Sequence, residues 1–260
     1  MFYHCSFSYF CKYGLKISPI RKADIDSLQR GTVVHLVLCR FIEKYKPNEY
    51  MSLGKNEKYN RVREIVNEAL ADYLSSKTLS QIDKTNLGFL YRQCANILDY
   101  IYEDLLQTNY SVSGVEVSFG NGEDDDFESV EIKLPSGGKA IISGKIDRVD
   151  SFVKDGVKYV RVIDYKTGTV NFSLSDVVYG LNLQMLLYLC AYKKQSDKKG
   201  DICVPAGVLY APVKDKSVFL KTRETTKDKV YSERRKTLKL NGIALDDETA
   251  LTAMEPKLEN

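Results

Sequence analysis

The stretch Gly144-Lys145-Ile146-Asp147-Arg148-Val149-Asp150 decides the fold, together with a second run, Val162-Ile163-Asp164-Tyr165-Lys166-Thr167-Gly168. Each is an apolar, strand-like run that ends in charged groups. Because successive side chains of a strand alternate between its faces, Asp164 and Lys166 share a face, and a neighbouring strand could bring Asp147 to them. Two carboxylates and a backbone carbonyl supply the oxygen ligands that a hard divalent cation prefers. The ammonium of Lys166 can orient and help deprotonate a water beside a phosphate. The pattern therefore predicts metal-assisted phosphodiester hydrolysis.

The composition predicts a folded domain but does not indicate which kind of molecule the domain binds. With 260 residues, 43% of them hydrophobic, the chain can bury a substantial core, and we expect one domain over residues 1–260. The formal charge of +3, from 38 basic and 35 acidic residues, is too small to indicate a nucleic-acid partner by itself. The sequence contains neither an apolar run as long as a membrane span nor the apolar block of a signal peptide. We therefore expect a cytoplasmic protein with no membrane contact.

Hydrophobic periodicity divides the chain into three parts: a largely helical part over 1–110, a sheet core over 111–225, and a helical tail over 226–260. Apolar residues spaced three and four apart predict helices within 2–17 and over 28–45, 59–75, 86–108, 176–192 and 226–239. Alternating β-branched runs between turn signals predict strands over 112–119, 129–134, 139–150, 157–165, 203–213 and 217–222. Short turns favour antiparallel hairpins, and the expected class is α/β (α+β).

The six cysteines are dispersed and contain no C-x-x-C pair. Cys39, Cys94 and Cys190 lie within apolar helical patterns, where cysteine behaves as a small hydrophobe, so we interpret them as core residues. Cys5 lies in an aromatic segment near the start of the chain. It could bind a metal or a cluster if partners existed elsewhere.

A structural interpretation competes with the catalytic one for the charged strand residues. Asp147 could be a strand-end carboxylate paired with Arg148 on the sheet surface, and Lys166 could form a purely structural ion pair with the acids. However, both acids lie in or at the end of apolar runs, and burying unpaired carboxylates costs several kcal/mol. Clustered acids of this kind therefore favour a cation or a basic partner.

Other polar residues could complete the site. His35 lies on an apolar helical face, so it is either a core histidine or a metal ligand that favours tolerance of manganese. Gln184 and Tyr188, four apart on one helix face, are either polar residues at the sheet boundary or contacts to DNA, the lysine or the phosphate. Glu116 could assist the metal through a water, or it could be a solvated strand residue. A basic helical stretch near the end of the chain could bind the DNA backbone, although a solvated helix face is the preferred interpretation; its basic residues are Lys227, Lys229, Arg234, Arg235 and Lys236.

Four segments, in this order, resemble the motifs of RecB-family nucleases of the PD-(D/E)XK superfamily. They are Gly31-Thr32-Val33-Val34-His35, the two stretches quoted above, and Gly180-Leu181-Asn182-Leu183-Gln184-Met185-Leu186-Leu187-Tyr188-Leu189. Residues 5–15, 205–210 and 240–245 resemble, in particular, the nuclease domain of the AddB-type subunit of bacterial ATP-dependent helicase–nucleases. The ordered set covers almost the whole chain and is far more specific than any single motif.

The resemblance implies a restriction-endonuclease-like core, in which helices flank a central mixed and mostly antiparallel sheet, with an N-terminal helical insertion. It implies Mg2+- or Mn2+-dependent exonuclease action on DNA, with single-stranded ends as the substrate. It also implies a role in double-strand-break end resection and recombinational repair with an AddA-like partner subunit.

The resemblance assigns site residues by motif position. The metal ligands would be His35, Asp147, Asp164 and the backbone carbonyl of Tyr165. The catalytic residues would be Asp147, Asp164, Lys166, Gln184 and Tyr188. Among them, Lys166 would activate the water, and Gln184 and Tyr188 would complete the site.

The chain departs from the family pattern in two ways. Family members hold a 4Fe-4S cluster with one Cys before the helical region and three after the nuclease core; Cys5 matches the first, and no matching trio follows here. A helicase-like region upstream is also missing, so we expect a fragment or a truncated gene product. Two alternatives share the motif order: a stand-alone RecB-like exonuclease of the CRISPR-associated or phage type, and a non-catalytic DNA-binding module. The second would be marked by loss of Asp147, Asp164 or Lys166, and all three are present.

Overall fold

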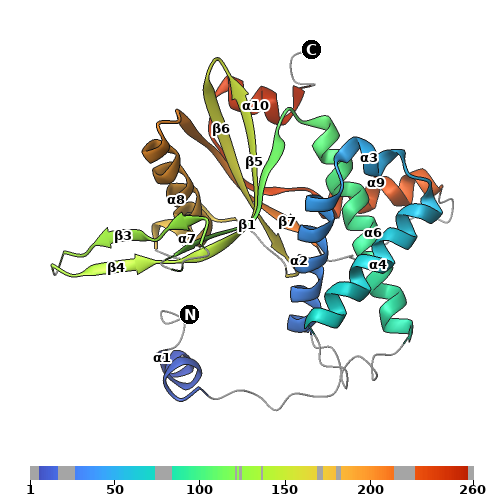
Figure 1. The fold of residues 1–260 in the computed structure, drawn as a ribbon, viewed down its shortest axis with the longest axis horizontal. Coiled ribbons are helices and arrows are strands. Elements are labelled where there is room, and N and C mark those ends of the chain that lie inside the picture. Colours follow the sequence, from blue (N-terminus) through green and yellow to red (C-terminus); the bar gives the residue numbers. More distant parts are fainter. Residues whose placement is uncertain are drawn as a thin grey trace.

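The computed structural model describes residues 6–16, 27–73, 84–120, 122, 125–135, 137–168, 172–179, 183–213 and 226–256. In these ranges a six-stranded sheet lies between a layer of helices and one long helix on its other face (Figure 1). The helical layer consists of α2 (Ser27–Lys44), α3 (Pro47–Ser52), α4 (Lys55–Tyr73), α6 (Lys84–Gln107) and α9 (Lys227–Leu238). The helix on the other face is α8 (Gln184–Lys199). Short elements complete the helices: α1 (Ser6–Tyr9), the π-helical turn η1 (Phe10–Gly14), α7 (Leu174–Val178) and α10 (Glu248–Met254).

The main sheet has the strand order β2-β1-β5-β6-β7-β8. Its strands are β1 (Ser111–Gly120), β2 (Phe127–Glu128), β5 (Gly144–Lys154), β6 (Val157–Lys166), β7 (Cys203–Pro212) and β8 (Asn241–Ala244). The pairs β1–β2 and β6–β7 are parallel and the other three are antiparallel. A separate antiparallel ribbon of β3 (Val130–Lys133) and β4 (Lys139–Ile142) projects from the body (Figure 1). The prediction of a mixed, mostly antiparallel sheet flanked by helices is therefore confirmed.

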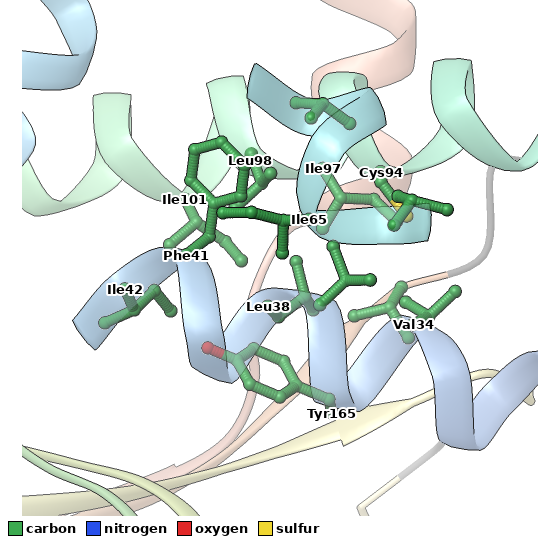
Figure 2. Close-up of a cluster of buried hydrophobic side chains, with 14 of the residues drawn as sticks. Val34, Leu38, Phe41, Ile42, Ile65, Cys94, Ile97, Leu98, Ile101 and Tyr165 are labelled. Carbon is green, nitrogen blue, oxygen red and sulfur yellow. The ribbon is translucent and has the colours of Figure 1, made fainter. Parts of the chain in front are cut away.

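The larger core lies between the helical layer and one face of the sheet. Apolar residues recur along α2, α4 and α6 at intervals of three and four, so each helix buries one stripe against the others. From β6, Ile163 and Tyr165 point into this core. Figure 2 shows the Tyr165 side chain under α2, close to Leu38 and Phe41. This packing holds α2 directly over the end of β6.

The opposite face of the sheet packs against α8. Val160 and Val162 of β6 and Val208 of β7 meet Met185 and Leu189 of the helix in a second buried cluster. Because the side chains of β6 alternate, residues 160 and 162 face α8 while 163 and 165 face the helical layer. Both faces of β6 are therefore covered, and residues 160–165 are all buried, the charged Arg161 and Asp164 among them.

The predicted elements agree with the structure except at a few boundaries. The strand predicted over 139–150 is interrupted at Ser143 and forms β4 and β5, and the helix predicted over 176–192 corresponds to α7 and α8. Helix α3 lies outside the predicted elements; it begins at Pro47, because proline fits the first turn of a new helix. Strand β8 also lies outside the predicted elements. A Cβ on Gly242 would lie 2.0 Å from the Val208 carbonyl oxygen, so only glycine allows this close strand approach.

Two cysteine interpretations are confirmed and one is wrong. Cys39 and Cys94 are buried as predicted, but Cys190 is exposed, because it lies on the side of α8 that faces away from the sheet. Cys5 and the strand predicted over 217–222 lie outside the described residues. Among the helices of the described ranges, none combines the length and the apolar character that crossing a membrane requires.

Candidate active site

The candidate site opens where β5 and β6 stop pairing. Their antiparallel ladder ends at Arg148 opposite Ile163, while β6 continues to Lys166 along its other neighbour, β7. Beyond the ladder, the backbone N–H of Tyr165 donates to Oδ2 of Asp147 at 2.8 Å. A side-chain carboxylate thus takes the place of the strand carbonyl that would otherwise accept this bond. Asp147 is thereby fixed where the two strands part.

Asp164 and Lys166 lie side by side on one face of β6, as alternation predicts. Nζ of Lys166 is 2.5 Å from Oδ2 of Asp164, and it lies 5.7 Å from the ring centre of Tyr210 on β7. Asp164 is buried, with 6% of its surface exposed, whereas about a third of the Lys166 side chain (34%) is exposed. The ammonium therefore covers the acid and faces solvent at the same time.

His35 reaches the same opening from α2. Its Nδ1 lies 3.3 Å from Oδ2 of Asp147, and its ring meets the Tyr165 ring edge-on with centres 5.8 Å apart. The neighbours Val34 and Leu38 are fully buried in the larger core, and Figure 2 shows both on α2 near Tyr165. Packing of the helix therefore determines where His35 stands, and residues from α2, β5 and β6 meet at one place.

The site carries an excess of negative charge. Burial raises the pKa of Asp164, and the charge of Asp147 adds to this, although Lys166 and His35 oppose it. Burial lowers the pKa of His35, but its hydrogen bond to Asp147 and the charges of both acids outweigh burial, so that its pKa is raised. The raised pKa of His35 indicates that the charges of the two acids outweigh that of Lys166 at this place, as a missing positive charge would produce.

A divalent cation would supply that charge, and the donor set fits one. Two carboxylates, an imidazole and a backbone carbonyl are ligands that Mg2+ or Mn2+ accepts. Within the described residues, however, no three His, Cys, Asp or Glu side chains stand in a ready arrangement for one ion. Asp164 is turned to Lys166, and Asp147 to His35 and Tyr165. Binding a cation would therefore require Asp164 to leave Lys166.

Gln184 and Tyr188, in the first turns of α8, lie beside the beginning of β5. Nε2 of Gln184 donates to Oη of Tyr188 at 2.6 Å, and the Tyr188 ring packs edge-on against Phe119 at 5.1 Å. A Cβ on Gly144 would lie 2.8 Å from Oη of Tyr188, so the strand passes close to this pair. In the described part of the chain, no hydrogen bond or ion pair joins Gln184 or Tyr188 to Asp147, Asp164 or Lys166.

Sequence reasoning missed a buried ionic network behind the site. Arg148 does not pair with Asp147 on the surface; it is 1% exposed on the opposite face, where it contacts Asp150 and the Tyr165 hydroxyl. Arg161 contacts Asp150 from β6, since the two residues are cross-strand neighbours. The signal was present, because Arg148 and Asp150 are two apart on one strand face and Arg161 lies on the next apolar run.

Glu116 lies beside the site without entering it. Its carboxylate accepts from Nζ of Lys145 at 2.7 Å, and its backbone adopts a φ of 50°, a left-handed conformation that non-glycine residues rarely take. It is half-buried, neither a free strand residue nor a direct partner of Asp147. Cys5, the residue predicted to bind an iron–sulphur cluster, lies outside the described part of the chain.

Comparison with known proteins gives the family. The model of the PD-(D/E)XK nuclease superfamily matches residues 1–255. Similar curated proteins include a subunit of the ATP-dependent helicase/deoxyribonuclease of Clostridium kluyveri, 33% identical over 99% of this chain and 22% of the relative. The same subunits of Clostridium novyi (32% identical, 98% and 23% covered) and Symbiobacterium thermophilum (34% identical, 98% and 22% covered) are similar in the same way. The chain thus spans about a fifth of the length of these relatives. It belongs to the PD-(D/E)XK nuclease superfamily.

Proposed function

We propose that this chain is the nuclease unit of a helicase–nuclease and that it hydrolyses phosphodiester bonds of DNA with the aid of Mg2+ or Mn2+. One observation carries the proposal: His35, Asp147, Asp164 and Lys166, from three separate elements, meet where β5 and β6 part. The superfamily match over residues 1–255 and the deoxyribonuclease names of the relatives support it.

In this proposal His35, Asp147, Asp164 and the backbone carbonyl of Tyr165 hold the cation. A bound divalent cation would lower the pKa of a water and offset charge on the phosphate oxygens. Asp147 stays anchored by the Tyr165 N–H, so it would act as the fixed ligand, and Asp164 would exchange its ion pair with Lys166 for the metal.

Lys166 then becomes available for the reaction. Its ammonium, released from Asp164, would orient the attacking water and stabilise the charge that builds on the phosphate as the water adds opposite the leaving oxygen. The new P–O bond forms as the ester P–O bond breaks; the attacking water releases one proton to solvent, and the leaving oxygen takes one proton from solvent. Gln184 and Tyr188, joined at the start of β5, would position the DNA strand at the edge of the site.

The names of the relatives suggest the biological setting. We propose that the unit works as an exonuclease on single-stranded DNA ends during double-strand-break resection, in the cytoplasm, together with an AddA-like partner subunit. A stand-alone RecB-like exonuclease would perform the same chemistry without that partner. A non-catalytic DNA-binding module would keep the fold and lose cleavage.

The test is strand cleavage by the purified chain. We expect a 5′-labelled single-stranded oligonucleotide to be degraded with Mg2+ or Mn2+ and to stay intact in EDTA. Asp164→Asn and Lys166→Ala should each reduce the rate by about 100-fold or more, because each removes a group that acts on the reacting phosphate. The exposed Asp201→Asn serves as the matched control and should cleave like the wild type.

Two results would overturn the proposal. Undiminished cleavage by Asp164→Asn, with an unchanged melting temperature, would remove this residue from the mechanism. Absence of cleavage by the wild type with either metal, while it still binds the oligonucleotide, would instead identify a non-catalytic module. Titration of Mn2+ into the wild type and Asp147→Asn by calorimetry tests the metal assignment separately from turnover, and equal affinities would contradict it.

A further inference from the structure

A second candidate site lies in the helical layer, on different elements from the acids of the active site. A cavity of about 490 Å³ is formed by α3, the first turn of α4, the middle of α6 and one residue of α9. These helices lie together in the layer on one side of the sheet (Figure 1). The cavity reaches the surface, because Lys55, Phe89 and Arg234, which line it, are exposed. Its volume lies within the range of about 300–1,000 Å³ that is typical of ligand sites.

The lining is strongly positive. It contains one carboxylate, Asp99, and four cations: Lys55, Lys58, Arg92 and Arg234. The carboxylate is already engaged, since it accepts from Nζ of Lys58 at 3.2 Å and from the Tyr50 hydroxyl at 3.1 Å. Among the described residues, no carboxylate pairs with Lys55, Arg92 or Arg234. The cavity therefore contains three positive charges that no carboxylate of the described residues compensates. Such an arrangement attracts an anion that carries several negative charges.

The lining also presents aromatic surface. Phe89 is 52% exposed, and the guanidinium of Arg92 lies over its ring at 4.9 Å. Tyr59 is half-buried and meets Tyr91 edge-on at 6.4 Å, which fixes the angle of its ring. An exposed ring beside unpaired cations suits a ligand with a flat π-system and an anionic group. Nucleotides combine the two, because the base stacks on an aromatic side chain while the phosphate pairs with Lys or Arg.

We propose that this cavity binds one nucleotide of a DNA strand, with the base on Phe89 and the phosphates on Lys55, Arg92 and Arg234. The inference rests on the proposed function, because it takes the strand to be the substrate. It assigns a DNA contact to helices other than the elements of the active site, and this contact would hold the strand on the helical layer while the strand is cut at the active site. A free nucleoside phosphate shares this chemistry, so the test separates the two sources.

The experiment measures binding without cleavage. The dissociation constant of a fluorescently labelled thymidine 15-mer is determined by anisotropy in EDTA, using the whole chain over a series of salt concentrations. Phe89→Ala should weaken binding by about 5-fold or more, as expected for the loss of one stacked base. The double variant Lys55→Gln/Arg234→Gln should lower the slope of log affinity against log salt by about 1.4, since each phosphate contact on a single strand contributes about 0.7.

Matched controls lie on the surface outside the cavity. Tyr73→Ala removes an exposed aromatic ring at the other end of α4, and Lys194→Gln/Lys239→Gln removes two exposed lysines. Both should bind the oligonucleotide within 2-fold of the wild type. Melting temperatures check that each variant folds, and Phe89→Leu keeps the apolar volume without the ring, so its affinity should fall as for Phe89→Ala.

The outcomes separate this inference from the proposed function. Wild-type affinity and salt slope in Phe89→Ala and in the double variant would refute the cavity site, and the cleavage assay would be unaffected by that result. If thymidine monophosphate binding depends on Phe89 while oligonucleotide binding does not, the strand is refuted as the ligand. A wild type that binds with these dependences yet never cleaves would support the cavity and refute the nuclease.

Discussion

Asp150 is the acid that compensates two buried guanidinium groups, so Asp150→Asn is the most informative test of the fold behind the site. The Asp150 side chain is fully buried, and Arg148 and Arg161 are only 1% and 2% exposed. Its Oδ2 accepts from Arg148 at 3.0 Å and from Nε of Arg161 at 3.1 Å, and its Oδ1 lies 2.9 Å from Nε of Arg148. Asp104, the other acid that faces Arg161, is 4.0 Å away.

The size of the effect follows from burial. Asparagine keeps the shape but not the charge, and leaving a buried ion without its partner costs about 3–5 kcal/mol. Here two cations lose their shared partner, and Asp104, which interacts with both arginines but forms its one long ion pair with Arg161, compensates them only in part. We therefore expect a loss of about 4 kcal/mol in the free energy of unfolding. For a chain of this size, that corresponds to a decrease of about 8–16 °C in melting temperature.

Urea unfolding followed by circular dichroism, together with a thermal scan, measures this loss. The exposed Asp201→Asn should change stability by less than about 0.5 kcal/mol. Cleavage should also decrease in Asp150→Asn, because Arg148 follows Asp147 in the chain and holds the Tyr165 hydroxyl at 3.3 Å. If Asp150→Asn unfolds within about 1 kcal/mol of the wild type, the two arginines do not depend on this carboxylate and the reasoning is wrong.

Three further predictions follow from single contacts. Gly144→Ala would place a Cβ 2.8 Å from the Tyr188 hydroxyl and should lower the free energy of unfolding in urea by about 1–3 kcal/mol. Gly88→Ala is the control and should not destabilise the protein, because a Cβ there would have nothing within 4 Å. Equal stability of the two variants would contradict the close approach of Gly144 to Tyr188. Iodoacetamide at pH 8 should label the exposed Cys190 in the native protein but not Cys94, because Cys94 is buried and burial raises its pKa to about 12. Peptide mass mapping that finds Cys94 labelled before Cys190 would refute this. The pKa of His35 is raised, so the native metal-free protein binds this proton more tightly than the unfolded chain; the stabilisation is complete below pH 6.5 and is lost as pH rises through the raised pKa. His35→Gln should flatten that part of the unfolding free energy plotted against pH, and an unchanged curve would be evidence against the contact with Asp147.

The sequence by itself determined the elements and the charged groups at their ends. Apolar residues at helical spacing located α2, α4 and α6, and alternation on β6 placed Asp164 and Lys166 on one face. These features are local, because the spacing of side chains along a helix or a strand depends only on backbone geometry. They can therefore be predicted from the sequence without knowledge of how the elements pack.

Only the tertiary structure decided which elements are neighbours. His35 meets Asp147 because α2 packs over the end of β6, and Arg148 is buried because the helical layer covers the face of β5 to which it points. Cys190 is exposed because α8 covers the sheet with its other side. The physical reason is that an apolar pattern states which face of an element must be buried but not what buries it, and that choice depends on contacts between residues far apart in the chain.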